Sequence, residues 1–118
     1  MVKVNKELIR GSTAIMVLSL LSQDDMYGYQ IIKEINKQSG GVFVFKEGTL
    51  YPILHALEAE GSVESYWVES NQGRRRKYYR ITSQGTNILK EKSAEWNQFK
   101  KAVDQVIGGM KLEPVPEP

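Results

Sequence analysis

The sequence predicts a mainly α-helical domain with one small β-hairpin, followed by a separate long helix. Apolar residues recur at helical spacing in four stretches of the chain. Two β-prone runs, residues 63–69 and 75–82, flank the turn sequence Ser70–Gly73. The last helical stretch carries an apolar seam that a core already formed by the first three helices cannot cover, so this helix is expected to contact another chain.

Composition restricts the functions open to this chain. Its 118 residues are enough for one modest core, and a net charge of +2 does not by itself indicate a nucleic-acid partner. The chain has no cysteine and a single histidine, His55, so we predict no disulfide, no metal site and no cofactor. No Gly-rich phosphate loop and no evident pair of catalytic carboxylates is present, so nothing indicates an enzyme.

The chain also lacks the sequence signals of a membrane or secreted protein. Its longest apolar run, Ala14–Leu21, is too short to cross a bilayer. Residues 1–10 alternate charged and apolar side chains and contain no secretory apolar region. A cytoplasmic location is therefore expected.

The first helix is expected from about Lys6 to Ser22, with Asn5 as its N-cap. Leu8 and Ile15 lie on one apolar stripe of this helix, and further apolar side chains widen the stripe. So many apolar residues around the helix predict burial on more than one side. In a small domain such a helix indicates contact with a second copy of the chain. We expect Leu8 and Ile15 in that interface.

A second helix is expected over residues 27–38, where Asp24 or Asp25 can cap its start and Gly40–Gly41 ends it. The apolar run Val42–Phe45 follows. It fits either a short strand or an extended connector laid across the core.

The third helical stretch, Lys46–Gly61, has two chemically different faces. Its apolar face consists of Leu50, Ile53, Leu54 and Leu57, and the outer face carries Gly48, Thr49, Tyr51, Pro52, His55, Ala56 and Ala59. A helix that is buried on one side and chemically varied at its N-terminal end suits the major groove of DNA. The alternative is a plain amphipathic core helix, which this segment taken alone favours. Gly61 is expected to end the helix as a left-handed cap.

The hairpin changes that balance, because its tip and second strand are strongly basic. Five of the sixteen basic residues lie within Arg74–Arg80. A solvated charge run is the usual explanation of such a cluster. At the end of a hairpin that directly follows a helix pair, a wing that contacts DNA phosphates becomes the better interpretation.

The last helix is expected to begin at a cap, Thr82 or Ser83, and to reach about Gly108. Its seam consists of Leu89, Trp96, Phe99, Val103, Val106 and Met110, at spacings of 7, 3, 4, 3 and 4 residues. A second copy of the chain is the simplest partner for it. We therefore divide the chain into a DNA-binding domain, residues 1–82, a dimerisation helix, residues 83–110, and a proline-rich tail, residues 111–118, that is expected to be disordered.

The order of these elements is that of a winged helix-turn-helix with a C-terminal dimerisation helix. Three stretches add a family resemblance: Tyr27-Gly28-Tyr29 followed by Ile31-Ile32, EGTLYPILHALEAEG, and GRRRKYYRITSQG from Gly73 to Gly85. With them the chain resembles the PadR family of bacterial transcriptional regulators, in particular its short type with a single C-terminal helix. The resemblance implies a homodimer whose recognition helices enter successive major grooves of a pseudo-palindromic operator, most commonly as a repressor.

The residues expected to contact double-stranded DNA are Tyr27, Tyr29, Gly48, Thr49, Tyr51, His55, Arg74, Arg75, Arg76 and Lys77. For Tyr27 and Tyr29, a phosphate contact by one of them and packing of one in the core are both open. Side chains alternate along a strand, so only two of the four wing cations can point the same way. We favour the two nearest the tip, Arg74 and Arg75.

Trp96 has two interpretations. It either fills the dimer interface, or with its mate near the two-fold axis it walls a flat slot for an aromatic effector. The second arrangement is similar to that of multidrug-sensing members of the family. The other candidate ligand contacts are Ile15, Lys92 and Lys100, and the two lysines would favour neutral or anionic aromatics over cations.

An alternative function is a dimeric small-molecule or protein-binding module that does not act through DNA. Such a module would have no need of a basic wing. The strongly basic hairpin therefore favours a DNA-binding regulator.

Overall fold

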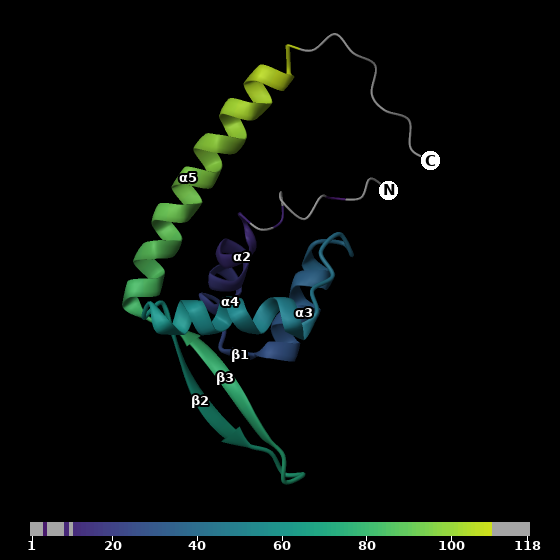
Figure 1. Ribbon diagram of the computed structural model, residues 1–118, viewed down its shortest axis with the longest axis vertical. Helices are drawn as coiled ribbons and strands as arrows, with labels where there is room; N and C mark the ends of the chain where they lie inside the picture. Colours follow the sequence, from purple (N-terminus) through teal and green to yellow (C-terminus); the bar gives the residue numbers. More distant parts are fainter. Residues whose placement is uncertain (1–3, 5–8, 10, 110–118) are drawn as a thin grey trace.

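The computed structural model describes Val4, Ile9 and residues 11–109. The described residues form four helices and a three-stranded antiparallel sheet, so the expected mainly α fold with a small β-wing is confirmed. The elements in chain order are α2 (Thr13–Leu21), β1 (Met26–Tyr27), α3 (Gly28–Gln38), α4 (Glu47–Ala59), β2 (Val63–Glu69), β3 (Arg75–Ile81) and α5 (Ser83–Ile107). The first three helices pack together, the hairpin of β2 and β3 projects from one side of them, and α5 rises away on the other (Figure 1). None of the described helices is long and apolar enough to span a membrane.

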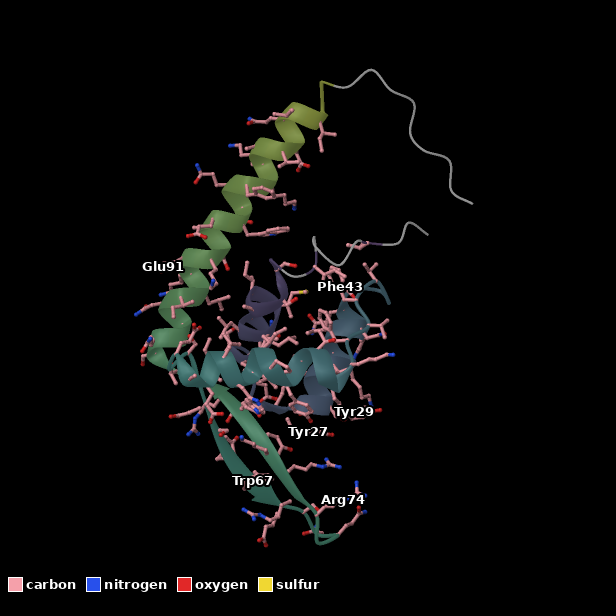
Figure 2. The ribbon with its side chains drawn as sticks, in the orientation of Figure 1. Tyr27, Tyr29, Phe43, Trp67, Arg74 and Glu91 are labelled. Carbon is pink, nitrogen blue, oxygen red and sulfur yellow. The ribbon has the colours of Figure 1, made fainter. Side chains whose placement is uncertain are left out.

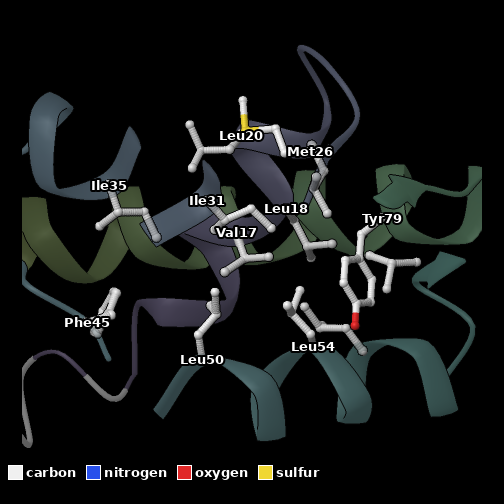
Figure 3. Close-up of a cluster of buried hydrophobic side chains, with 13 residues drawn as sticks. Val17, Leu18, Leu20, Met26, Ile31, Ile35, Phe45, Leu50, Leu54 and Tyr79 are labelled. Carbon is white, nitrogen blue, oxygen red and sulfur yellow. The ribbon is translucent and has the colours of Figure 1, made fainter. Parts of the chain in front are cut away.

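The core lies where α2, α3 and α4 meet one face of the sheet (Figure 3). Leu50, Leu54 and Leu57 of α4 are buried, and Ile53, the fourth member of its predicted apolar face, is half-buried against the core. The sheet contributes Tyr79, which is only 1% exposed. No local pattern in the run 75–82 singled out this tyrosine as a core residue. Burial raises the pKa of its phenol, and the nearby Glu58 adds to this effect.

The predicted first helix is interrupted: Ile9 is helical, and a turn separates it from α2. Helix α2 starts at Thr13, and Gly11 and Ser12 form a turn, so the prediction of one continuous helix up to Ser22 is wrong. The hydroxyls of Ser12 and Thr13 both donate to the carbonyl of Ile9, at 3.0 and 2.9 Å. Such side-chain bonds compete with helix propagation, and glycine disfavours it. The predicted cap Asn5, the predicted start Lys6 and the interface candidate Leu8 lie outside the described residues.

The start of α3 also differs from prediction. Its N-cap is Tyr27 in extended conformation, so neither Asp24 nor Asp25 caps it. Asp25 instead accepts a hydrogen bond of 2.6 Å from the Tyr66 hydroxyl on the wing, which raises the pKa of that phenol. Strand β1, which sequence analysis missed, pairs Met26 with Tyr79 and Tyr27 with Tyr78. Two residues are too few to show an alternating pattern.

A glycine turn and an extended connector follow α3. Gly40 and Gly41 have φ angles of 63° and 85°, which end the helix. Residues 42–45 form an extended connector rather than a strand, with Phe45 buried and stacked 6.4 Å from Phe43. The open choice between strand and connector is thereby decided.

A compact junction joins the end of α4 to the start of α5, and we call its five residues, Gly61, Ser62, Thr82, Gln84 and Gly85, the joint. Gly61 adopts the predicted left-handed cap, with φ 83°. The hydroxyl of Thr82 donates to the Gly61 carbonyl at 2.6 Å and accepts from the Gly85 N–H at 3.0 Å, so Thr82 is the cap of α5. The Gln84 side chain donates to the carbonyl of Glu60 at 2.8 Å. Several hydrogen bonds therefore fix α5 to the end of α4.

Candidate nucleic-acid interface

A concave surface lies between the start of α3, the outer face of α4 and the wing, and it encloses a volume of about 360 Å³. Its lining consists of Tyr27, Gly28, Tyr29, Tyr51, His55, Trp67, Arg75, Arg76, Lys77 and Tyr79. Tyr27, Tyr29, Trp67 and Arg74 all lie on the lower side of the molecule, below α4 (Figure 2). The fold therefore brings together seven of the ten residues predicted to contact DNA.

Helix α4 contributes two of them, Tyr51 and His55. Tyr51 is half-buried, and burial is the main cause that raises the pKa of its phenol, with smaller contributions from Glu47 and Tyr79. The hydroxyl therefore keeps its proton at neutral pH and remains a hydrogen-bond donor. The other two candidates on α4, Gly48 and Thr49, are exposed near its start and lie outside the concave lining.

The ring of Tyr51 lies against the first residue of α3. A Cβ atom placed on Gly28 would come within 2.7 Å of Tyr51 Cε1 and 2.8 Å of its hydroxyl oxygen. Only glycine leaves room for the phenol in this position. Gly28, which was quoted for the family resemblance but not as a site residue, therefore leaves the space that the Tyr51 ring occupies.

We expect Gly28→Ala to displace the Tyr51 ring from the concave surface. The added methyl group must push the ring away, at a cost of about 1–3 kcal/mol in unfolding free energy. Reduced freedom of the unfolded chain offsets roughly 0.4–1 kcal/mol of it. Denaturant unfolding of Gly28→Ala measures the difference. In a Tyr51→Ala background the same change is expected to be neutral or stabilising, and equal destabilisation in both backgrounds would contradict the contact.

The two tyrosines at the start of α3 are on the concave surface and neither is fully buried. Tyr27 meets the ring of Tyr78 edge-on, with centroids 5.4 Å apart, and the Arg76 guanidinium lies 4.5 Å above its ring. Tyr29 is exposed, with the Lys33 ammonium 5.6 Å from its ring. The alternative that one of these tyrosines packs in the core is not observed.

The wing cations divide between the two faces of the hairpin. Arg75 and Lys77 alternate with Arg76 along β3 and share the face of the buried Tyr79. Lys77 is engaged within the protein, with its ammonium 3.8 Å from Glu58 and 5.5 Å from the Tyr79 ring. Arg74 precedes the strand, in the loop whose Gly73 has φ 78°, and lies outside the concave lining.

Trp67 is the site residue that sequence analysis missed. It pairs with Lys77 in the register of β2 and β3, and the Arg75 guanidinium lies 4.7 Å above its indole. The available signal was that Trp67 lies in the run 63–69, which the predicted hairpin pairs with the basic run 75–82. The pairing register was not known from sequence.

The candidates for a second interface lie along α5 and α2. Phe99 is 60% and Val106 78% exposed, and Trp96 is exposed and stacked on Phe99 with centroids 6.1 Å apart. Val103 and Ile15 are half-buried, whereas Leu89 packs on the core of its own chain. Of the two lysines, Lys92 is half-buried and Lys100 is exposed.

Comparisons with known proteins agree with this architecture. The family model described as the transcriptional regulator PadR-like family matches residues 17–91. An uncharacterised protein of Lysinibacillus sphaericus is 37% identical over 107 residues, which span 91% of this chain and 98% of that protein.

Solved structures give the same result. A transcriptional regulator from Clostridium thermocellum is 40% identical with a TM-score of 0.79, over 85% of this chain and 97% of that one. A PadR-like transcriptional regulator from Bacillus cereus is 30% identical with a TM-score of 0.79, over 89% of this chain and 100% of that one. The chain belongs to the PadR-like family: it is a transcriptional regulator and not an enzyme.

Proposed function

We propose that this regulator is a repressor that binds a pseudo-palindromic operator as a homodimer, with the concave surface facing the duplex. The observation that carries the proposal is that Arg75, Arg76 and Lys77, from the two faces of the hairpin, line the same concave surface as Tyr51 and His55. Helix α4 enters the major groove, where the imidazole and phenol reach base edges or phosphates. The wing arginines neutralise the DNA backbone beside it.

The dimer is proposed from the exposed apolar row on α5. Trp96, Phe99 and Val106 share one side of the helix and are exposed on the single chain. Exposed apolar patches of this kind mark interaction sites, and a two-fold dimer is the commonest way to cover one. A dimer presents two copies of α4, which matches an operator with two half-sites. Repression needs no further partner, because a bound dimer blocks access to the DNA that it covers.

An aromatic effector is part of the proposal. The stacked rings of Trp96 and Phe99 offer flat apolar walls near the expected two-fold axis. Ile15, Lys92 and Lys100 are the further candidate contacts, and the lysines favour neutral or anionic rings. Binding there changes the spacing of the two wings and releases the operator.

The test uses the full chain and a fluorescent duplex taken from the DNA upstream of its own gene. Anisotropy is expected to show a dimer on the duplex, with the logarithm of the affinity falling by about 0.9 per phosphate contact for each tenfold rise in salt. A scrambled duplex of the same length is the control and is expected to bind more weakly. Lone chains at micromolar concentration in sedimentation, or equal binding to both duplexes, would contradict the proposal.

Adding planar dyes to the same complex tests the effector. An anionic dye is expected to quench Trp96 fluorescence and to release the duplex at lower concentration than a cationic dye of equal size. Tighter binding of the cationic dye would reject the assigned role of Lys92 and Lys100.

A further inference from the structure

Arg75, like Arg76 over Tyr27, differs from Lys77 and Arg80 in what holds it. Lys77 has a carboxylate partner, Glu58, at 3.8 Å, and Arg80 has Glu64 at 2.9 Å. Within the described part of the chain, no carboxylate lies within ion-pair distance of Arg75. Its guanidinium is instead held by an aromatic face, 4.7 Å above the indole of Trp67.

Stacking leaves the hydrogen-bonding capacity of an arginine intact. The guanidinium is planar, and its five N–H groups lie in that plane. An indole below the plane occupies the flat face, whereas a carboxylate would occupy the N–H edge. Arg75 therefore keeps its fork of donors free while its position is restricted, which suits bidentate binding of a phosphate.

Trp67 is not explained by the core. It is 55% exposed and lies on β2, which is an edge strand of the sheet. Trp67 therefore has no packing role of the kind that the buried Tyr79 has. The indole lies below the Arg75 guanidinium and in the same concave surface as Tyr51 and His55.

We propose that Trp67 is a positioning residue for Arg75, which it pre-orients toward a phosphate of the operator. The inference depends on the proposed DNA-binding role of the concave surface. By holding the side chain before DNA arrives, the indole lowers the entropy lost when Arg75 binds.

A double-mutant cycle tests this role in the full-length protein, with the duplex described above. Trp67→Leu is expected to weaken binding about two- to fivefold, the range of an exposed cation–π contact converted to affinity. In an Arg75→Ala background the same change is expected to have no further effect. Trp67→Phe keeps an aromatic face and is expected to recover part of the loss.

Salt dependence separates positioning from loss of charge. Arg75→Ala removes a cation, so the salt slope is expected to fall by about 0.9 for each phosphate that Arg75 neutralises in the wild-type complex. Trp67→Leu keeps the cation and is expected to leave the slope nearly unchanged. Val68→Ala, on the opposite face of β2, is the matched control and is expected to keep wild-type affinity.

Two results would overturn the proposal: a Trp67→Leu loss that persists in the Arg75→Ala background, or no loss at all. Unfolding curves of each variant exclude a folding defect. The Arg75 Nε–H resonance gives a readout that needs no DNA, because the indole ring current shifts it and Trp67→Leu is expected to abolish that shift. If wild-type protein binds no duplex while the ring-current shift is present, the proposed DNA role fails and the contact itself stands.

Discussion

Replacing Gly85 with alanine is expected to destabilise the protein more than any other small-to-small change in the joint. A Cβ at this position would lie 2.0 Å from the carbonyl oxygen of Ser62 and 2.9 Å from Ile81 Cγ1. The first obstacle is backbone, so no side chain can rotate away to make room. We expect a loss of at least about 3 kcal/mol, which is a large part of the roughly 5–15 kcal/mol that holds a small domain folded.

Urea unfolding monitored by circular dichroism measures the effect. Gly48→Ala is the matched control, because a Cβ there meets nothing within 4 Å in the first turn of α4. Alanine has the higher helix propensity, so this control is expected to gain up to about 1 kcal/mol in unfolding free energy. A Gly85→Ala protein with a wild-type unfolding midpoint would show that the joint is looser than described.

The second large effect is expected from the wing. Combining Arg75→Ala with Arg76→Ala should weaken operator binding by at least about 100-fold at low salt, taking roughly 1.5 kcal/mol for each charge-assisted hydrogen bond removed. Both guanidinium groups line the concave surface. The loss is expected on all sequences alike, because phosphates carry no sequence information. Anisotropy titrations at two salt concentrations measure both the affinity and its salt slope.

Two single variants serve as controls for the double change. Arg80→Ala is expected to bind almost as well as wild type, because Arg80 pairs with Glu64 at 2.9 Å and lies over the Tyr66 ring outside the concave lining. Arg74→Ala measures the residue that the sequence favoured and that lies in the loop. If Arg74→Ala alone weakens binding as much as the double variant, the duplex contacts the wing tip rather than the concave surface.

Local patterns predicted much of this fold. The apolar face of α4, the cap of α5 at Thr82 and the left-handed Gly61 all depend on residues within a few positions of one another. Their physical causes are helical periodicity, side-chain capping and backbone freedom. The wing followed from two β-prone runs around a turn and is present as β2 and β3.

Features that depend on distant pairing were not predictable in the same way. Strand β1 exists only because Met26 and Tyr27 meet Tyr79 and Tyr78 of β3, far along the chain. The burial of Tyr79 and the place of Trp67 in the site follow from the strand register, which no local pattern reveals. The break before α2 depends on hydroxyl bonds to Ile9 that compete with the helix.

The joint has a mechanical consequence. It ties the end of α4 to the beginning of α5 through Thr82, Gln84 and Gly85, so we expect the two helices to move together as one rigid unit. In a dimer formed along α5, a change in the angle between the two α5 helices would therefore displace the N-terminal end of each α4. An effector bound between the α5 helices would thus change the angle at which the two α4 helices meet the duplex, while the structure within each domain stays the same.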